Sequence, residues 1–203
     1  MGTVDFFEPD PVVPDQEPDE QERDPRSGPA FDELPAIAPI NALMATNEHV
    51  AIVLSSVRVF SDGVELLVER RMRRSGMTRA DFRDLTEERR IRSDSDAHAS
   101  RLRYGVLLAD GERLAGSTPW FREVEGTTVS PEQHSLATTG QSGGGSDNRY
   151  EHRDDLWLHP LPPAGPLELV TQWPLAGIGE THFEMDANLL LDLVPRVRPL
   201  WDD

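Results

Sequence analysis

The sequence predicts a mostly-β fold: an antiparallel sandwich or partial barrel with a short C-terminal helix and one weak helical insertion. Roughly six to eight apolar runs have the length of strands and are separated by turn residues. Two of the separators are Asp62-Gly63 and Asp110-Gly111, pairs that are typical of tight β-hairpins. Helical patterns do not alternate with these strands, which argues against the parallel sheet of an α/β fold.

Residues 1–34 form an acidic, proline-rich segment ahead of a single β-rich domain that is expected to span 35–203. The segment has eleven acidic residues against two Arg, and few apolar groups that could offset the entropy of ordering it. We therefore expect a disordered tail. One patch in it is typical of a short docking peptide, with flanking acids and prolines around Phe6, Phe7, Val12 and Val13. The alternative is an unstructured terminus whose aromatic side chains dock loosely on their own domain.

The first two long strands are expected on either side of Asp62-Gly63. Val50–Leu54 is apolar throughout, which is typical of a central strand covered on both faces. In the following run, Val64, Leu66 and Val68 occupy alternate positions. That period predicts a second strand with one buried face.

An Arg-rich insertion is expected over residues 70–100. Its first part, 70–92, contains nine Arg and four acidic residues. Thr78 and the acid three residues later fit a capping box, which predicts a short helix over about 79–90. Only Phe82 and Leu85 form its apolar stripe, so the helix should be weakly held.

Residues 140–148 are rich in Gly and Ser and predict a flexible loop. The stretch lacks the GK[ST] and GxGxxG spacings and does not open a helical pattern, so it is not interpreted as a phosphate cradle.

The stretch LWLHPLPPAGPLELVTQWPLAGIGE, residues 156–180, predicts two strands joined by a stiff hairpin connection. Proline lacks the backbone donor of a strand ladder, so HPLPPAGP must lie between strands. Trp157 and Trp173 are expected to fill the space between two sheets. Asp186 is a natural N-cap for the C-terminal helix, and Pro195 should bend or shorten that helix. The apolar face of the helix comprises Leu189, Leu190, Leu193, Val194 and Val197.

The composition excludes several chemistries. All 20 basic residues are Arg, and the chain contains no Lys and no Cys. Lysine Schiff bases, Walker-type phosphate loops, thiol nucleophiles, thiolate metal sites and disulfides are therefore excluded. The metalloprotease motif HExxH does not occur either.

The charge and hydropathy of the chain restrict its partners and location. A net charge of −17 opposes binding to nucleic acid or to an anionic membrane. No apolar run approaches the about 20 residues of a membrane span, and the first residues lack the apolar segment of a signal peptide. Since there are no cysteines to form disulfides, we expect a cytoplasmic protein without membrane insertion.

The most suggestive polar pattern is ETHFEMD. As a strand it places His182, Glu184 and Asp186 on one face, a ligand set that suits a divalent metal. The alternative is that Phe183 and Met185 point into the core, so that the three polar side chains face water.

A second polar run, YEHRDDLWLH, is less favourable for a metal. His152 and Asp154 share one strand face, whereas Asp155 and His159 share the other. No single face collects three ligands.

The run DDLWLHPLPPAGPLELVTQWPLAGIGET, followed by an acidic strand and a helix ending in LW, resembles a group of uncharacterised proteins from high-GC actinobacteria. They share the segment LWLxPLPPxGPLxLVxxWPxxGIxE. The resemblance covers roughly residues 48–201, and the all-Arg composition agrees with such a source. It implies a shared β-sandwich-like domain, and it assigns no activity, cofactor or catalytic residue.

These observations favour a non-enzymatic protein–protein interaction module or an accessory module of a larger assembly, without a cofactor. The acidic tail or an exposed sheet face would contact the protein partner. A first alternative is a divalent-metal-binding domain or metal-dependent enzyme that uses His182, Glu184 and Asp186. A second is a nucleic-acid-associated regulator that uses the Arg-rich segment, although that segment lacks interleaved aromatic residues for base stacking.

Overall fold

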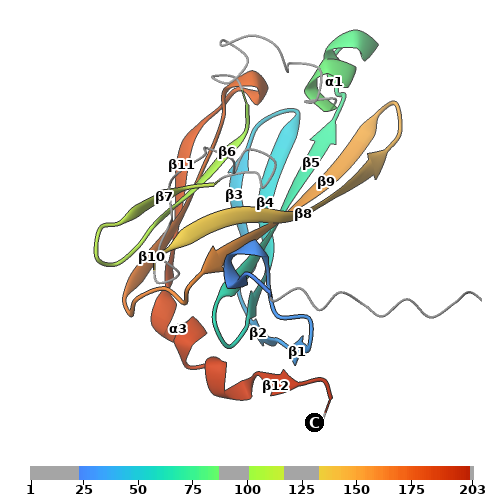
Figure 1. Ribbon diagram of the computed structural model, residues 1–203. Coiled ribbons are helices and arrows are strands. Elements are labelled where there is room, and N and C mark those ends of the chain that lie inside the picture. Colours follow the sequence, from blue (N-terminus) through green and yellow to red (C-terminus); the bar gives the residue numbers. More distant parts are fainter. Residues whose placement is uncertain (1–22, 87–100, 117–132, 202–203) are drawn as a thin grey trace, which may run out of the picture.

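Two antiparallel sheets face each other in the structure and enclose the core (Figure 1). The structure is a computed structural model that describes residues 23–86, 101–116 and 133–201. The larger sheet has the order β2-β4-β5-β9-β8, and β3 also pairs with β4. Its strands are β2 (Ala36–Ala38), β3 (Ala42–Thr46), β4 (Val50–Val59), β5 (Val64–Arg73), β8 (Ser135–Gly145) and β9 (Arg149–His159).

The second sheet has four strands in the order β11-β10-β6-β7. They are β6 (Arg103–Leu107), β7 (Arg113–Ala115), β10 (Pro166–Trp173) and β11 (Ile178–Asp186). A two-stranded ribbon pairs β1 (Glu33–Leu34) with β12 (Arg198–Pro199). The expected mostly-β, antiparallel class is confirmed, and the described strands form open sheets without a closed barrel.

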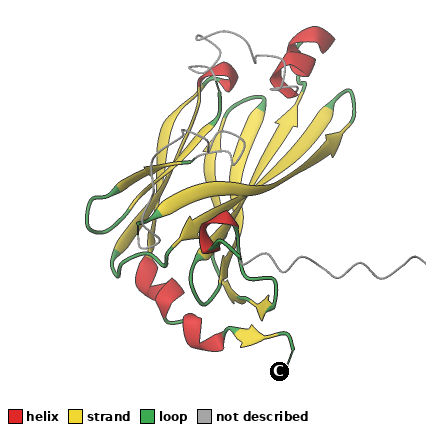
Figure 2. Ribbon diagram, viewed as in Figure 1, coloured by secondary structure: helices red, strands yellow, loops and turns green. Residues whose placement is uncertain are grey.

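Most of the short helices lie at the ends of the sheets, whereas η1 lies over the outer face of the larger sheet (Figure 2). None in the described part of the chain is long and apolar enough to cross a membrane. They are η1 (Pro25–Ser27), α1 (Arg79–Thr86), η4 (Pro174–Ala176), α3 (Ala187–Leu191) and η5 (Val194–Arg196).

The main core lies between the two sheets and follows the period of the strands. Alternate residues of β4, β5 and β9 point inward and are fully buried, and Trp173 of β10 meets them from the other sheet. Trp173 is therefore a core residue, as expected. Burial of these aliphatic side chains provides the main stabilisation of the sandwich.

A second apolar cluster covers the outer face of the larger sheet. It comprises Phe60, Leu67, Ala137 and Trp157, all buried but outside the main core. Trp157 was expected between the sheets, and that prediction is wrong. Its neighbours Leu156 and Leu158 point into the core, so strand alternation turns Trp157 outward. The prediction of one buried face for β5 is wrong for the same reason, since this cluster also covers the outer side of the strand.

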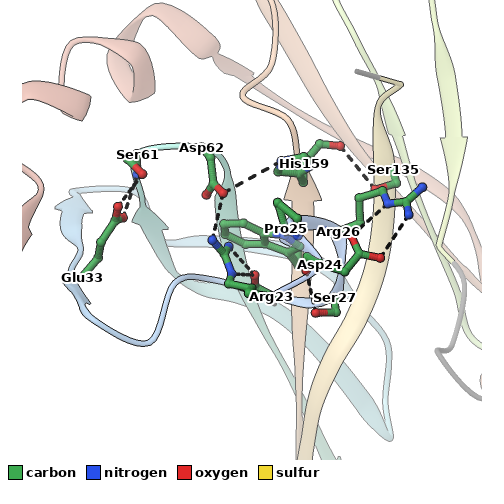
Figure 3. A network of polar contacts seen from close by, with 12 residues as sticks. Arg23, Asp24, Pro25, Arg26, Ser27, Glu33, Ser61, Asp62, Ser135 and His159 are labelled. Carbon is green, nitrogen blue, oxygen red and sulfur yellow. Dashed lines mark hydrogen bonds and ion pairs between the residues drawn. The ribbon is translucent and has the colours of Figure 1, made fainter. Parts of the chain in front are cut away.

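Residues 23–28 cover this outer cluster (Figure 3). The indole Nε1 of Trp157 donates to the carbonyl oxygen of Pro25 at 2.8 Å. Arg23 pairs with Asp62 at 3.1 Å and also donates to the carbonyl of Gly28. The fold therefore begins before residue 35, and residues 23–34 are not a disordered tail. A buried indole needs both cover and a hydrogen-bond acceptor, and η1 supplies them.

Both Asp-Gly hairpins are present, but the two glycines serve different purposes. Gly111 has φ +88°, the left-handed value that a tight turn favours. Gly63 has no such value; a Cβ atom there would lie 2.5 Å from Cζ2 of Trp157. Gly63 therefore leaves room for the indole ring.

The Gly/Ser-rich stretch is a strand rather than a loop. Gly140–Gly145 forms the end of β8 and pairs with β9, and the turn is confined to residues 146–148. A Cβ atom on Gly143 would lie 2.7 Å from the ring of His152. Because glycine has no side chain, the ring of His152 can approach the backbone of β8 at this position. Composition alone does not distinguish such a glycine from one that makes a loop flexible.

The proline-rich connection after β9 links the two sheets and is not a hairpin within one sheet. β9 ends at His159 in the larger sheet, and β10 begins at Pro166 in the smaller one. The sequence correctly placed the prolines between strands, but it could not show to which sheet each strand belongs.

The two helix predictions are largely confirmed. Asp81 N–H donates to Oγ1 of Thr78 ahead of α1, whose Phe82 and Leu85 are buried; residues 87–90 lie outside the described part. Asp186 caps α3 by accepting from Asn188 N–H at 2.9 Å.

The apolar face predicted for the C-terminal helix is wrong in part. α3 ends at Leu191, so Leu193, Val194 and Val197 lie beyond it. Leu189 is 55 % exposed, whereas Leu190 is buried.

We predict that Gly63→Ala destabilises the protein by about 1–3 kcal/mol, because the new methyl group overlaps the buried indole of Trp157. Urea unfolding measures the change. Gly179→Ala is the matched control, since no atom lies within 4 Å of its added Cβ; its effect should stay within about 0.5 kcal/mol. Equal unfolding free energies for the two variants would contradict this role of Gly63.

Candidate functional site

A polar cluster interrupts the core at one end of the sandwich. Its centre is the carboxylate of Asp154, which is 1 % exposed. Arg70 of the neighbouring strand reaches it at 3.0 Å, Gln141 of β8 donates at 2.9 Å, and Tyr104 of the opposite sheet donates at 2.8 Å. The guanidinium of Arg70 also lies over the ring of Trp173, 5.3 Å from its centroid. One carboxylate thus connects both sheets.

The cluster holds Asp154 in its ionised form. Burial alone raises the pKa of this carboxyl, but His152, Arg70 and Tyr104 outweigh burial and lower the pKa to about 2. His152 Nε2 lies 3.3 Å from the carboxylate without hydrogen-bond alignment, so we interpret its contribution as electrostatic.

A cavity of about 200 Å³ borders this cluster, lined by Tyr104, Gln141 and Asp154 among others. The polar groups that face it already bond to one another. Its geometry therefore suits a structural link between the sheets better than a binding site for a ligand.

A larger groove of about 690 Å³ lies at the end of the larger sheet where β4 begins and β5 ends. The β3–β4 turn, the last residues of β5 and the tip of the β8–β9 hairpin line it. Its apolar lining comprises half-buried Ala51 and Tyr150 and buried Val50 and Met72, and its charged lining comprises Arg71, Arg73, Arg149 and Glu151.

Two arginines in this groove face each other across adjacent strands. Arg73 of β5 is directly opposite Arg149 of β9 in the antiparallel register, and both are exposed. Arg73 donates to the backbone carbonyl of Glu48 at 2.6 Å. Within the described residues, neither guanidinium forms an ion pair with a carboxylate. Like charges directly opposite each other destabilise a sheet, so an anion bound between them would be stabilised.

Elsewhere on the same outer face, arginines are neutralised. Three ion pairs follow the face toward the groove: Arg58–Glu65 at 3.1 Å, Arg153–Asp155 at 2.7 Å and Arg71–Glu69 at 2.6 Å. The uncompensated positive charge is therefore confined to the groove.

The Arg-rich segment does not form a continuous basic surface in the described residues. Arg70 is buried against Asp154, and Arg79 pairs with Asp147. Arg71 pairs with Glu69. Arg89, Arg90 and Arg92 lie outside the described residues. Much of the local charge predicted for nucleic-acid binding is thus engaged within the protein.

The residues predicted as metal ligands share one face of β11 but do not converge. His182 lies between two other carboxylates, Glu168 at 2.7 Å and Glu180 at 3.1 Å, and their hydrogen bonds raise its pKa. Glu184 is exposed opposite Glu168, and Asp186 caps α3. In the described part of the chain, no three His, Asp or Glu side chains are arranged to hold a metal ion. The metal hypothesis gains no support from this geometry.

The predicted docking residues Phe6, Phe7, Val12 and Val13 lie outside the described residues. Conversely, the sequence analysis did not identify Arg73 or Arg149 as a pair. Their opposition depends on the register between β5 and β9, strands that are far apart in the chain. The sequence contained no local signal for it.

We predict that Asp154→Asn reduces the acid sensitivity of stability. The folded pKa of about 2 lies below the ordinary value of 3.8, so this carboxylate stabilises the fold above about pH 4. That contribution, about 2 kcal/mol, is lost as the pH falls toward 2. Unfolding free energies from pH 5 to 2 should therefore decline less steeply in the variant.

At neutral pH the same variant should be less stable by about 3–5 kcal/mol, because the buried guanidinium of Arg70 loses the negative charge of Asp154. Tyr104→Phe is the control that keeps both charges and removes one hydrogen bond. Parallel pH profiles for the native protein and Asp154→Asn would refute the assigned pKa.

Comparison with known proteins adds no family to these observations. No protein-family model matches the chain, no curated protein is significantly similar to it, and no solved structure matches it significantly. The resemblance to actinobacterial proteins therefore stays a prediction, and the site must be interpreted from its own geometry.

Proposed function

We propose that the chain is a non-enzymatic protein-interaction module whose groove binds carboxylate-rich peptide segments of a partner protein. The observation that supports this function is the cross-strand pair Arg73 and Arg149, two guanidiniums without carboxylate partners in a groove of about 690 Å³. A carboxylate between them would accept charge-assisted hydrogen bonds and relieve their repulsion.

The shape and lining of the groove favour a peptide over a small anion. Half-buried Ala51 and Tyr150 add apolar lining to the groove, which suits a segment that combines acidic and apolar side chains. Arginine binds carboxylates in a planar, two-pronged geometry, and that geometry adds specificity as well as affinity.

The charge of the whole chain favours a short acidic segment over a nucleic acid. A net charge of −17 repels an extended polyanion, whereas a short peptide contacts only the locally positive groove. We therefore favour a protein partner over the nucleic-acid alternative.

We predict that Arg73→Gln and Arg149→Gln each weaken binding of an acidic peptide at least about tenfold, the effect of losing one charge-assisted hydrogen bond. The probe is a fluorescein-labelled peptide of alternating Glu, Asp and Phe, measured by fluorescence anisotropy. Binding should also weaken as NaCl is raised.

Arg113→Gln is the matched control, since Arg113 is exposed on β7 of the other sheet and its loss changes the net charge equally. It should leave the affinity within about twofold. The unfolding free energy of Arg149→Gln should not fall, because the variant removes a like-charge contact. Binding that survives both groove substitutions, equal binding of a Gln/Asn/Phe peptide, or tighter binding of a labelled oligonucleotide would each overturn the proposal.

A further inference from the structure

We infer that the groove is occupied by the acidic N-terminal segment of the same chain, residues 1–22, which competes there with partner peptides. This inference rests on the proposed function of the groove and names its intramolecular ligand. Three features support it. They are the position at which the segment leaves the fold, its length relative to the distance to the groove, and the opposite charges of the segment and the groove.

The segment leaves the fold on the same sheet face as the groove. The hydrogen bond between Trp157 and Pro25 fixes η1 on the outer face of the larger sheet, and Arg23 is held at the β4–β5 turn by Asp62 (Figure 3). By register with Trp157, Arg73 and Arg149 belong to this outer face too. A segment that extends from Arg23 therefore need not pass around an edge of the sheet to reach them.

The segment is long enough to reach the groove. β4 extends from the turn near Asp62 to Val50 in the groove, and its ten residues span about 33 Å. An extended segment of 22 residues reaches at most about 75 Å. About ten residues before Arg23 would therefore cover the distance, which brings residues 1–13 to the groove.

The part that reaches the groove has complementary chemistry. Residues 1–22 contain eight acidic and no basic side chains. Asp5, Glu8 and Asp10 lie close to Phe6 and Phe7 in the sequence, and their carboxylates complement two guanidiniums that lack carboxylate partners among the described residues. Prolines at 9, 11, 14 and 18 restrict the backbone, which lowers the entropy cost of binding.

Ion pairs along the route direct the segment toward the end of the sheet. The outer-face arginines Arg58, Arg153 and Arg71 each have a carboxylate partner, so they offer little net attraction. The uncompensated charge begins at Arg73 and Arg149. Because the residues just before Arg23 have to span this neutralised part of the face, the acidic tip is the part that lies at the two arginines.

The test compares two triple variants in the full chain with the labelled Glu/Asp/Phe peptide as probe. The tip variant is Asp5→Asn/Glu8→Gln/Asp10→Asn, and the linker variant is Asp15→Asn/Glu17→Gln/Asp19→Asn. Both remove three negative charges. A tethered segment has an effective concentration of about 1 mM, so a weak intramolecular ligand with a Kd of about 0.1 mM weakens probe binding about tenfold. The tip variant should therefore bind the probe about tenfold more tightly than the native chain, and the linker variant should bind it as weakly as the native chain does.

Each outcome separates this inference from the proposed function. A probe affinity that depends on Arg149 but is the same in the native chain and in the tip variant would overturn the inference and leave the function standing. Equal gains in probe affinity in the tip and linker variants would show an effect of total charge, and they would also overturn the inference. A gain that depends on protein concentration would assign the segment to a second copy and reject the intramolecular site. Absence of probe binding to the native chain, the tip variant and the linker variant would refute the proposed function itself.

Discussion

The buried carboxylate of Asp154 constrains much of the arrangement of the two sheets. A charge between two sheets is tolerated only when it is fully compensated, and here the compensating groups come from β5, β6 and β8. A slip of one residue along β9 would turn Asp154 to the outer face and separate its carboxylate from Arg70. Hydrophobic burial stabilises the sandwich, but this cluster specifies which residues face each other.

The same alternation along β9 determines what the outer face offers. Because Asp154, Leu156 and Leu158 point inward, Trp157 and Arg149 must point outward. At one end of the face, η1 covers the tryptophan. At the other end, Arg149 meets Arg73 without a counter-ion among the described residues. The covered end and the charged end of this face are both consequences of one strand register.

Local patterns predicted the strands, the capped helices and the core position of Trp173, because each depends on neighbours within a few residues. The errors arose where a distant contact decides the outcome. Gly140–Gly145 looked like a loop by composition, but β9 lies against it and its glycines permit that close approach. Residues 23–34 looked like a tail, but a buried indole far along the chain binds Pro25, and β1 pairs with β12. The candidate ligands on β11 share a face, yet each has a different neighbour.

The sequence alone determined the class of fold and the excluded chemistries. These properties follow from composition and from periods of two residues, which need no knowledge of long-range contacts. Only the tertiary structure decided that Arg73 lies opposite Arg149, that Trp157 faces outward under η1, and that the proline-rich connection joins two sheets. Strand pairing brings together residues far apart in the chain, and the register that selects them depends on the packing of the whole sandwich.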